Sequence, residues 1–173
     1  PKVIWSVGGS VDWHRGRTSM IIKSAENSQE HITDVDFVTG CALLVRLAIL
    51  EQVGTLDPRF FAYYEEAEWC VRIRRAGYRI VHVPQAEIWH KIPPQDGRAL
   101  SPVVHYYMTR NRLLFLLATG AGLRAWVYTG AELLRTLTSW TLRPRWRSKR
   151  AQRKAMLRAL ADAWHGRWGK ASL

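Results

Sequence analysis

Apolar residues recur at helical spacing in several parts of the chain. Residues 47–53 and 63–74 each have an apolar face with this period, and a glycine follows each segment where a helix commonly ends. From Pro102 the period returns, and it continues as an amphipathic pattern over residues 126–140. We therefore expect helices over these four segments.

Short apolar runs between turn residues predict strands. These runs are Ile4–Gly9, which leads into a glycine turn, Phe37–Val45, Tyr78–Val83 and Ala86–His90. We assign Phe37–Val45 to a central sheet, with Gly40 where a bulky side chain would obstruct an approaching substrate or backbone. Residues 11–31 are polar with little periodicity, so we expect an exposed loop there.

Composition bounds the class of protein and its partners. The 173 residues suffice for one domain, and 47% of them are hydrophobic, as in a globular protein. The formal net charge of +12 favours polyanionic partners: nucleic acid, acidic phospholipid headgroups or diphosphate substrates. Cys41 and Cys70 lack metal-ligand spacing and indicate a reduced, cytosolic chain. The sequence shows no initiator methionine, signal peptide or membrane-spanning apolar run, so we interpret it as a piece of a longer protein.

Three carboxylates fall within four positions at the predicted start of the second helix. Glu65, Glu66 and Glu68 follow two aromatic pairs, Phe60–Phe61 and Tyr63–Tyr64. Acids in the first helical turn are stabilised by the helix dipole, so a solvated, capped helix start is one interpretation. The other interpretation places ionised carboxylates at the edge of an apolar pocket, where aromatic rings restrict water.

The acidic stretch and its surroundings resemble bacterial family 2 glycosyltransferases of the GT-A fold, especially rhamnosyltransferase-like members. Residues 65–72 are similar to that family's Glu-Asp-x-Asp-Leu-x-x-Arg segment. Five further stretches match family motifs in order and spacing: Val35–Arg46, Val53–Phe61, Gly77–Pro84, Ile88–Lys91 and Tyr106–Arg112. Together they cover roughly Ile4 to Leu117.

The resemblance implies the fold and the division of the chain. The fold class would be α/β: a partial GT-A fold, Rossmann-like, with a helical extension. Residues 1–118 would form the C-terminal, acceptor-side half of the catalytic domain, and residues 119–173 a basic amphipathic helical tail. Because the nucleotide-binding half would lie outside this chain, we expect no turnover from the chain by itself.

The resemblance also implies roles for individual residues. Glu66 matches the aspartate that usually serves as general base, although glutamate is one methylene longer and therefore changes the reach. Glu65 would orient that base or bind the acceptor. The implied substrate-binding residues are Asp36, Gly40, Tyr64, Glu68, Trp89, Lys91, Arg110 and Asn111.

A divalent metal, Mg²⁺ or Mn²⁺, is the implied cofactor. Asp34 and Asp36 spell the Asp-x-Asp pattern of the family's metal motif, and carboxylate oxygens suit these ions. However, the pair follows polar sequence and precedes an apolar run, so we align it with a later strand and place the main metal motif in the missing N-terminal half. His90 would supply a metal ligand, although a lone histidine commonly makes only a hydrogen bond.

Basic residues crowd near the C-terminus together with three tryptophans, Trp140, Trp146 and Trp164. The basic residues are Arg143, Arg145, Arg147, Lys149, Arg150, Arg153, Lys154 and Arg158. This composition is typical of an interfacial helix on anionic lipid, and a merely solvated basic tail is the alternative.

Three functions follow. The favoured one is an inverting glycosyltransferase that moves a sugar from a nucleotide-sugar donor to a lipid-linked or polysaccharide acceptor, in the cytoplasm and peripheral at the inner face of the cell membrane. A peripheral membrane or scaffold protein without activity is the second. A nucleic-acid-binding module is the third, and we do not expect it because the charge concentrates in the tail and no known nucleic-acid-binding motif is present.

Overall fold

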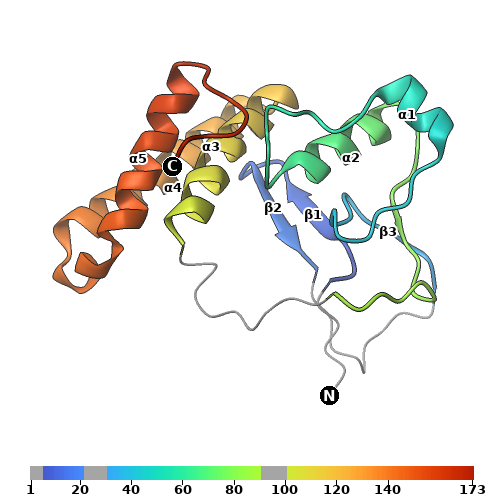
Figure 1. Ribbon diagram of the computed structural model, residues 1–173, viewed down its shortest axis with the longest axis horizontal. Helices are drawn as coiled ribbons and strands as arrows, with labels where there is room; N and C mark the ends of the chain where they lie inside the picture. Colours follow the sequence, from blue (N-terminus) through green and yellow to red (C-terminus); the bar gives the residue numbers. More distant parts are fainter. Residues whose placement is uncertain (1–5, 22–30, 91–100) are drawn as a thin grey trace. The chain divides into compact units, whose positions relative to one another are not determined.

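The structure is a computed structural model, and it describes residues 6–21, 31–90 and 101–173 (Figure 1). Its short sheets and longer helices confirm a mixed α/β class. The chain forms two compact units. The first contains the described parts of Pro1–Asp12, Arg17–Asp57 and Glu65–Lys91, and the second contains those of Trp13–Gly16, Pro58–Tyr64 and Ile92–Leu173. The predicted division at residue 118 stays a prediction.

The strands of the described residues pair into two small antiparallel sheets. β1 (Gly9–Asp12) pairs with β2 (Arg17–Met20), with Gly9 opposite Met20. β3 (Thr33–Asp34) pairs with β4 (Val81–His82). The β1–β2 hairpin contradicts the loop expected over residues 11–31. The sequence did not indicate it, because few apolar residues alternate in these strands and the period-2 signal is weak.

The predicted strand at Phe37–Val45 is wrong. Phe37 is buried and forms a single bridge with Gly9, whereas Leu44 is fully exposed. Ala86–His90 is likewise not a strand, and Tyr78–Val83 contributes only the two residues of β4. A strand needs a neighbour for its backbone N–H and C=O groups, and the described residues offer none along most of these runs.

Two helices of the first unit agree with their predicted positions. α1 (Leu47–Val53) ends where the backbone N–H of Gly54 donates to the Leu50 carbonyl at 2.8 Å. α2 (Glu65–Arg75) is followed by Gly77, whose φ of 91° is the left-handed conformation that glycine adopts without strain. The Trp69 indole Nε1 donates to the Gly54 carbonyl at 2.8 Å and ties the two helices together.

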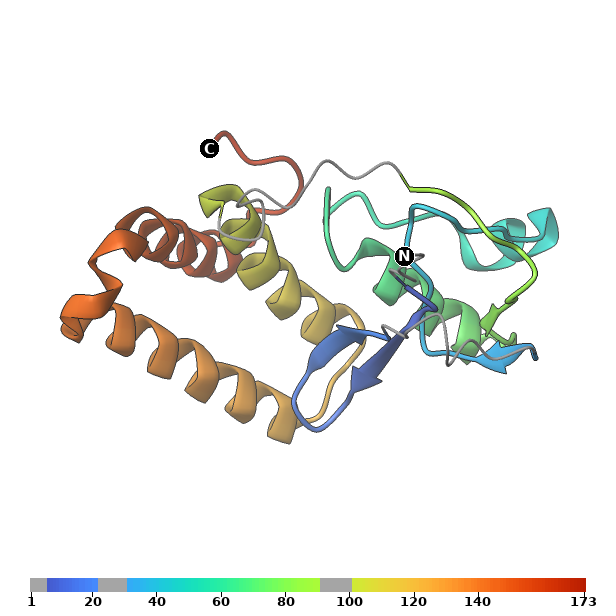
Figure 2. The same cartoon turned by 90° about the horizontal axis from the view of Figure 1, so that it is seen from below.

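The second unit is helical (Figure 2). Its elements are α3 (Pro102–Ala118), α4 (Leu123–Leu142), the 3₁₀ helix η3 (Pro144–Lys149) and α5 (Arg150–Trp164). Tyr106 and Tyr107 of α3 pack against Ala159 of α5, and the Tyr106 hydroxyl donates to Asp162 at 2.7 Å. Among the described residues, no helix has both the length and the apolarity to cross a bilayer.

The segment Trp13–Gly16 belongs to this helical unit. Arg112 of α3 donates to the carbonyls of Arg15 and Gly16, both at 2.8 Å. A side chain at Gly16 would bring a Cβ within 2.5 Å of Leu116, and its φ of 57° also favours glycine. Gly16 therefore permits a close approach between this turn and α3.

Candidate active site

Helix α2 opens with two adjacent, half-buried acids, Glu65 and Glu66. Acids in its first turn and arginines in its last turn both complement the helix dipole. One carboxylate oxygen of each acid, Oε2, is buried and has no hydrogen-bond partner among the described residues. Buried polar atoms are normally paired in folded proteins. These two oxygens therefore have hydrogen-bonding capacity that the described residues do not use.

The surroundings of Glu66 raise its proton affinity. Burial raises the pKa of Glu66 to about 6, and the negative charge of Glu65 adds to the rise. A hydrogen bond from the backbone of Gly40 opposes it. Burial also raises the pKa of Glu65. At neutral pH Glu66 is thus mostly ionised, yet it binds a proton more tightly than an ordinary glutamate does, which suits a general base.

One face of α2 lies along residues 36–40, which run in the opposite direction. Glu66 interacts with the backbone of Gly40, Cys70 with the backbone of Val38, and Arg74 with the carboxylate of Asp36. Four helical residues rise about 6 Å and two extended residues about 6.6 Å, so the contacts stay in register. Tertiary structure thus brings two separate motifs to one place.

Cys70 takes no part in nucleophilic chemistry at this place. Burial raises the pKa of its thiol to about 11, so the thiol is protonated at neutral pH. Cys41 is also free and is exposed, and neither cysteine forms a disulfide.

Gly40 borders open space beside Glu66. A Cβ built on Gly40 meets no atom within 4 Å, and its φ lies outside the left-handed region. The backbone therefore tolerates other residues here, and the absent side chain leaves room next to the Glu66 carboxylate. The predicted role of Gly40 in substrate binding stays a prediction.

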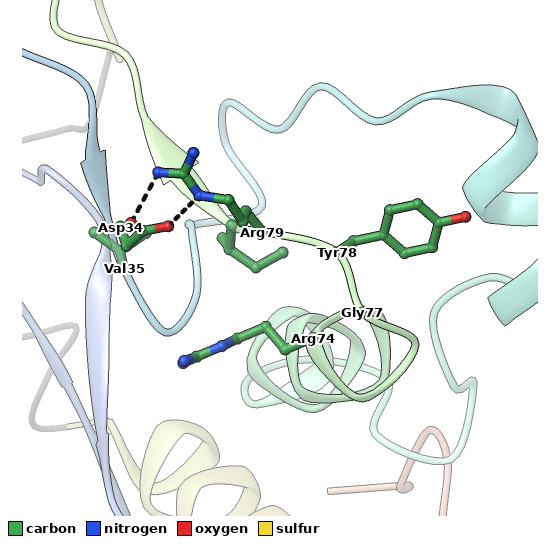
Figure 3. A pocket seen from close by; sticks show the side chains of 7 residues that line it. Asp34, Val35, Arg74, Gly77, Tyr78 and Arg79 are labelled. Atoms are coloured by element: carbon green, nitrogen blue, oxygen red, sulfur yellow. Dashed lines mark hydrogen bonds and ion pairs between the residues drawn. The ribbon is translucent and has the colours of Figure 1, made fainter.

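Asp36 is already occupied by protein contacts. Its Oδ1 pairs with Arg74, and its Oδ2 accepts the backbone N–H of Val11 at 2.8 Å. Asp34, the other acid of the Asp-x-Asp pattern, receives two bonds of 2.9 Å from Arg79 (Figure 3). Those bonds lower the pKa of Asp34. Both carboxylates thus serve ion pairs with arginines in this structure.

A hollow of about 270 Å³ lies beside Asp34, Arg74 and Arg79. It is at the C-terminal end of α2, where Gly77 follows the helix, whereas the two acids are at the N-terminal end. In Figure 3 the Tyr78 side chain points away from the Arg79–Asp34 pair. The hollow is therefore separate from the acid pair.

Glu68 has a structural partner. Its two carboxylate oxygens accept hydrogen bonds from Nε of Arg72 at 2.8 and 3.0 Å. Glu68 and Arg72 are the i,i+4 pair that the sequence pattern indicates. Arg72 also donates to the carbonyls of Val53 and Thr55, at 2.7 and 2.8 Å. Glu68 is buried, so this pair anchors α2 to the end of α1.

In the second unit, residues 58–64 carry the aromatic side chains that precede the acids. Phe60 and Tyr64 are buried, and the Tyr64 ring lies 5.4 Å from that of Phe115. Phe61, Tyr63 and Tyr64 have φ values of 66°, 69° and 73°. Left-handed conformations are unfavourable for bulky residues and persist only where surrounding contacts impose them.

Arg110 and Asn111 supply those contacts. Arg110 donates to the carbonyls of Arg59 and Phe60 at 3.3 and 3.2 Å and to that of Gly169 at 2.8 Å. Nδ2 of Asn111 lies 2.8, 2.6 and 2.9 Å from the carbonyl oxygens of residues 60, 62 and 63. Both side chains are fully buried. They hold the backbone that leads to Glu65, a role that sequence reasoning missed.

The remaining predicted residues are exposed or lie outside the described residues. Trp89 and His90 are exposed, in an irregular segment after β4. Lys91 lies outside the described residues. Within the described ranges, no three His, Cys, Asp or Glu side chains form a group able to hold a metal ion. A ligand role for His90 stays a prediction.

Comparison with known sequences identifies the family. The family described as "Glycosyltransferase like family 2" matches residues 7–105, which is more than half of the chain. The chain belongs to this family. The matched range holds the acid pair, Gly40 and the ion pairs of α2, whereas the Arg110–Asn111 pair lies just beyond it. No solved structure matches the chain.

Three curated relatives show how much of a longer protein the chain covers. The low-salt glycan biosynthesis hexosyltransferase Agl10 of Haloferax volcanii is 30% identical over 57% of this chain and 32% of its own length. The N-acetylglucosaminyl-diphospho-decaprenol L-rhamnosyltransferase of Mycobacterium tuberculosis is 39% identical over 37% of this chain and 21% of its own. The dTDP-rhamnosyl transferase RfbF of Shigella flexneri is 30% identical over 42% of this chain and 27% of its own length. The chain thus spans a third or less of each relative.

Proposed function

We propose that this chain is the acceptor-side half of a GT-A glycosyltransferase that transfers a sugar, with inversion, from a nucleotide-sugar donor to a glycan or lipid-linked acceptor. Membership of family 2 supports sugar transfer, and the names of the relatives support hexosyl or rhamnosyl transfer onto glycans or a lipid diphosphate. The observation that carries the proposal is the half-buried Glu66. Its pKa is raised, and one of its carboxylate oxygens has no hydrogen-bond partner among the described residues.

In this mechanism Glu66 is the general base. The acceptor hydroxyl oxygen forms a bond to the anomeric carbon while the bond from that carbon to the diphosphate oxygen breaks. The nucleoside diphosphate leaves with the electron pair, and the hydroxyl proton passes to the Glu66 carboxylate. A single displacement from the opposite side inverts the anomeric configuration. A positioned base of this kind contributes about 10²–10⁴-fold to the rate.

Glu65 supports the base by charge and by binding. Successive helical residues point about 100° apart, so both carboxylates do not reach the same proton. The charge of Glu65 keeps the proton affinity of Glu66 high, and its own unpaired oxygen is available for an acceptor hydroxyl. The open space at Gly40 gives that hydroxyl room to approach.

A divalent metal, when bound, would neutralise the charge that develops on the leaving diphosphate. The described residues do not form a metal site by themselves. The steps assigned above to Glu65 and Glu66 need no metal contact with either residue.

The test uses the full-length product of the gene that encodes this chain. Transfer from a panel of nucleotide sugars to a membrane extract is measured for the wild type, Glu66→Gln and Glu65→Gln, with donor binding measured separately. We expect Glu66→Gln to lower kcat by about 10²-fold or more while donor binding survives. We also expect wild-type kcat/KM to fall with decreasing pH below about 6, as Glu66 takes up a proton.

Two results would contradict this assignment. If Glu66→Gln retains activity while Glu65→Gln loses it, the base is Glu65. If the wild type consumes no donor in the presence of Mg²⁺ or Mn²⁺, sugar transfer itself is wrong for this protein, and the inactive peripheral membrane protein becomes the better interpretation.

A further inference from the structure

Helix α4 presents apolar side chains to solvent along its length. Leu123, Val127, Leu134 and Leu142 are 78%, 63%, 68% and 73% exposed. Their spacing places the first three within about 40° around the helix axis, with Leu142 at one edge. We call these four residues the α4 stripe. The two buried residues of the helix, Ala125 and Thr129, point to the opposite side.

The α4 stripe extends along the whole helix. A helix of 20 residues is about 30 Å long, and the four residues run from its first position to its last. Figure 2 shows α4 at one margin of the helical unit, with η3 at its end. Large exposed apolar surfaces commonly mark sites that bind a partner or a membrane.

The charge around the α4 stripe is positive. Residues 119–173 contain 12 Lys and Arg against two acids, a net +10 out of the chain's +12. Both acids are paired: Glu132 with Arg112 at 2.9 Å, and Asp162 with Arg167 at 2.8 Å. The negative charges of this region are therefore already neutralised, and its surface potential is set by the basic side chains.

Several basic residues lie where they would flank the α4 stripe. Arg124 and Arg135 are the next residues after Leu123 and Leu134, on one edge of the exposed face. Arg143, Arg145 and Arg147 follow Leu142 directly and are exposed. An apolar stripe bordered by arginines is the arrangement of a helix that lies in the plane of a membrane interface.

Two of the tryptophans that suggested membrane contact are used elsewhere. The Trp140 ring lies 5.4 Å from that of His105 and 6.4 Å from that of Trp146. Both indoles are only partly exposed, whereas Trp164, at the end of α5, is almost fully exposed. The apolar contribution of this surface therefore comes from leucine and valine of α4.

We infer that the α4 stripe docks on the surface of an anionic bilayer. The leucine and valine side chains enter the boundary between headgroups and acyl chains, and the neighbouring arginines contact lipid phosphates. A second copy of this chain fits less well, because it would bring a second set of about ten positive charges to the same surface. An anionic bilayer satisfies both the apolar stripe and the charge.

The test measures flotation of the full-length gene product with vesicles of phosphatidylcholine alone or with about 30% phosphatidylglycerol. We expect binding only to the anionic vesicles, weakening as salt screens the charges. Val127→Ser with Leu134→Ser should weaken binding at least about tenfold, because two apolar side chains no longer leave water. Arg143→Gln, Arg145→Gln and Arg147→Gln should each cost about fivefold.

A matched control makes the same two substitutions, one valine and one leucine, on a different helix. Val103→Ser with Leu117→Ser changes one valine and one leucine of α3 that are 46% and 59% exposed. This variant should bind anionic vesicles as the wild type does. Circular dichroism of both double variants checks that the helices remain folded.

Several outcomes would overturn the inference. One such outcome is wild-type protein that binds neutral and anionic vesicles equally, or that binds neither. Another is a stripe variant that binds as tightly as the control. A dimer that Val127→Ser with Leu134→Ser dissociates would show a second copy on the stripe. Nucleic acid bound at physiological salt without vesicle binding would assign the basic surface to that partner instead.

Discussion

At the scale of single residues, the features of Glu66 that suit it to act as a base also lower the stability of the fold. Its carboxylate is partly removed from water, lies beside a second acid and has an oxygen without a described partner. Such an arrangement lowers the stability of the fold. Proteins retain arrangements of this kind where the group performs chemistry.

We therefore expect Glu66→Gln to stabilise the protein at pH 7.5 by about 1–2 kcal/mol. The folded-state pKa of about 6 exceeds the ordinary value of 4.5, so the carboxylate destabilises the fold above pH 6. As pH falls from about 6 to 4.5 the wild type recovers this free energy, and the difference from the variant disappears. Urea unfolding of both proteins across this range measures it. A variant that is less stable than the wild type at pH 7.5 would contradict the expectation.

Gly40 gives a second residue-scale prediction. Gly40→Leu fills the open space beside Glu66 without backbone strain. We expect a Tm within about 2 °C of wild type, as for surface substitutions away from packing, and an acceptor KM raised at least about tenfold. The control is Gly122→Leu, at a site where an added Cβ likewise meets no atom within 4 Å. Unchanged acceptor kinetics in Gly40→Leu would remove Gly40 from the site.

At the scale of elements, α3 fixes the backbone of residues 59–63. Arg110 and Asn111 donate hydrogen bonds to carbonyls of this segment. Its backbone has positive φ at Phe61 and Tyr63, and so does Tyr64, which follows it. The prediction that these two residues bind substrate was not tested, but their polar groups already have protein partners. The structure favours a role in positioning.

We expect Asn111→Ala to lower the free energy of unfolding by about 2–4 kcal/mol, because it removes the hydrogen bonds to buried carbonyls and leaves a cavity. Denaturant unfolding measures the loss, and activity assayed where the variant is still folded should fall through kcat. Met108→Ala, on an exposed part of the same helix, serves as the control and should change stability by less than about 1 kcal/mol. An Asn111→Ala protein of wild-type stability would exclude the positioning role.

At the scale of the whole molecule, chemistry and charge are distributed differently along the chain. The acid pair and Gly40 lie within the range that matches the family, whereas +10 of the net charge of +12 belongs to residues 119–173, beyond that range. The family assignment therefore says nothing about the α4 stripe. Sugar transfer and membrane docking are separate proposals, and failure of one leaves the other standing.

The sequence by itself determined the features that depend on neighbouring residues. Helical period and a following glycine located α1 and α2, spacing of four paired Glu68 with Arg72, and ordered motifs indicated the family. Each of these depends on residues within a few positions of one another, or on motifs that the chain presents in order.

Only the tertiary structure decided which partners the long-range polar groups take. The bonds of Asn111 reach carbonyls about 50 positions away, and the contact of Glu66 with Gly40 spans 26 positions. It also decided that Phe37–Val45 forms no strand, because strand formation depends on a neighbouring backbone and not on the apolar run alone. The outward stripe of α4 was hidden for the same reason: an amphipathic period indicates that a helix has two faces, but only packing decides which face is covered.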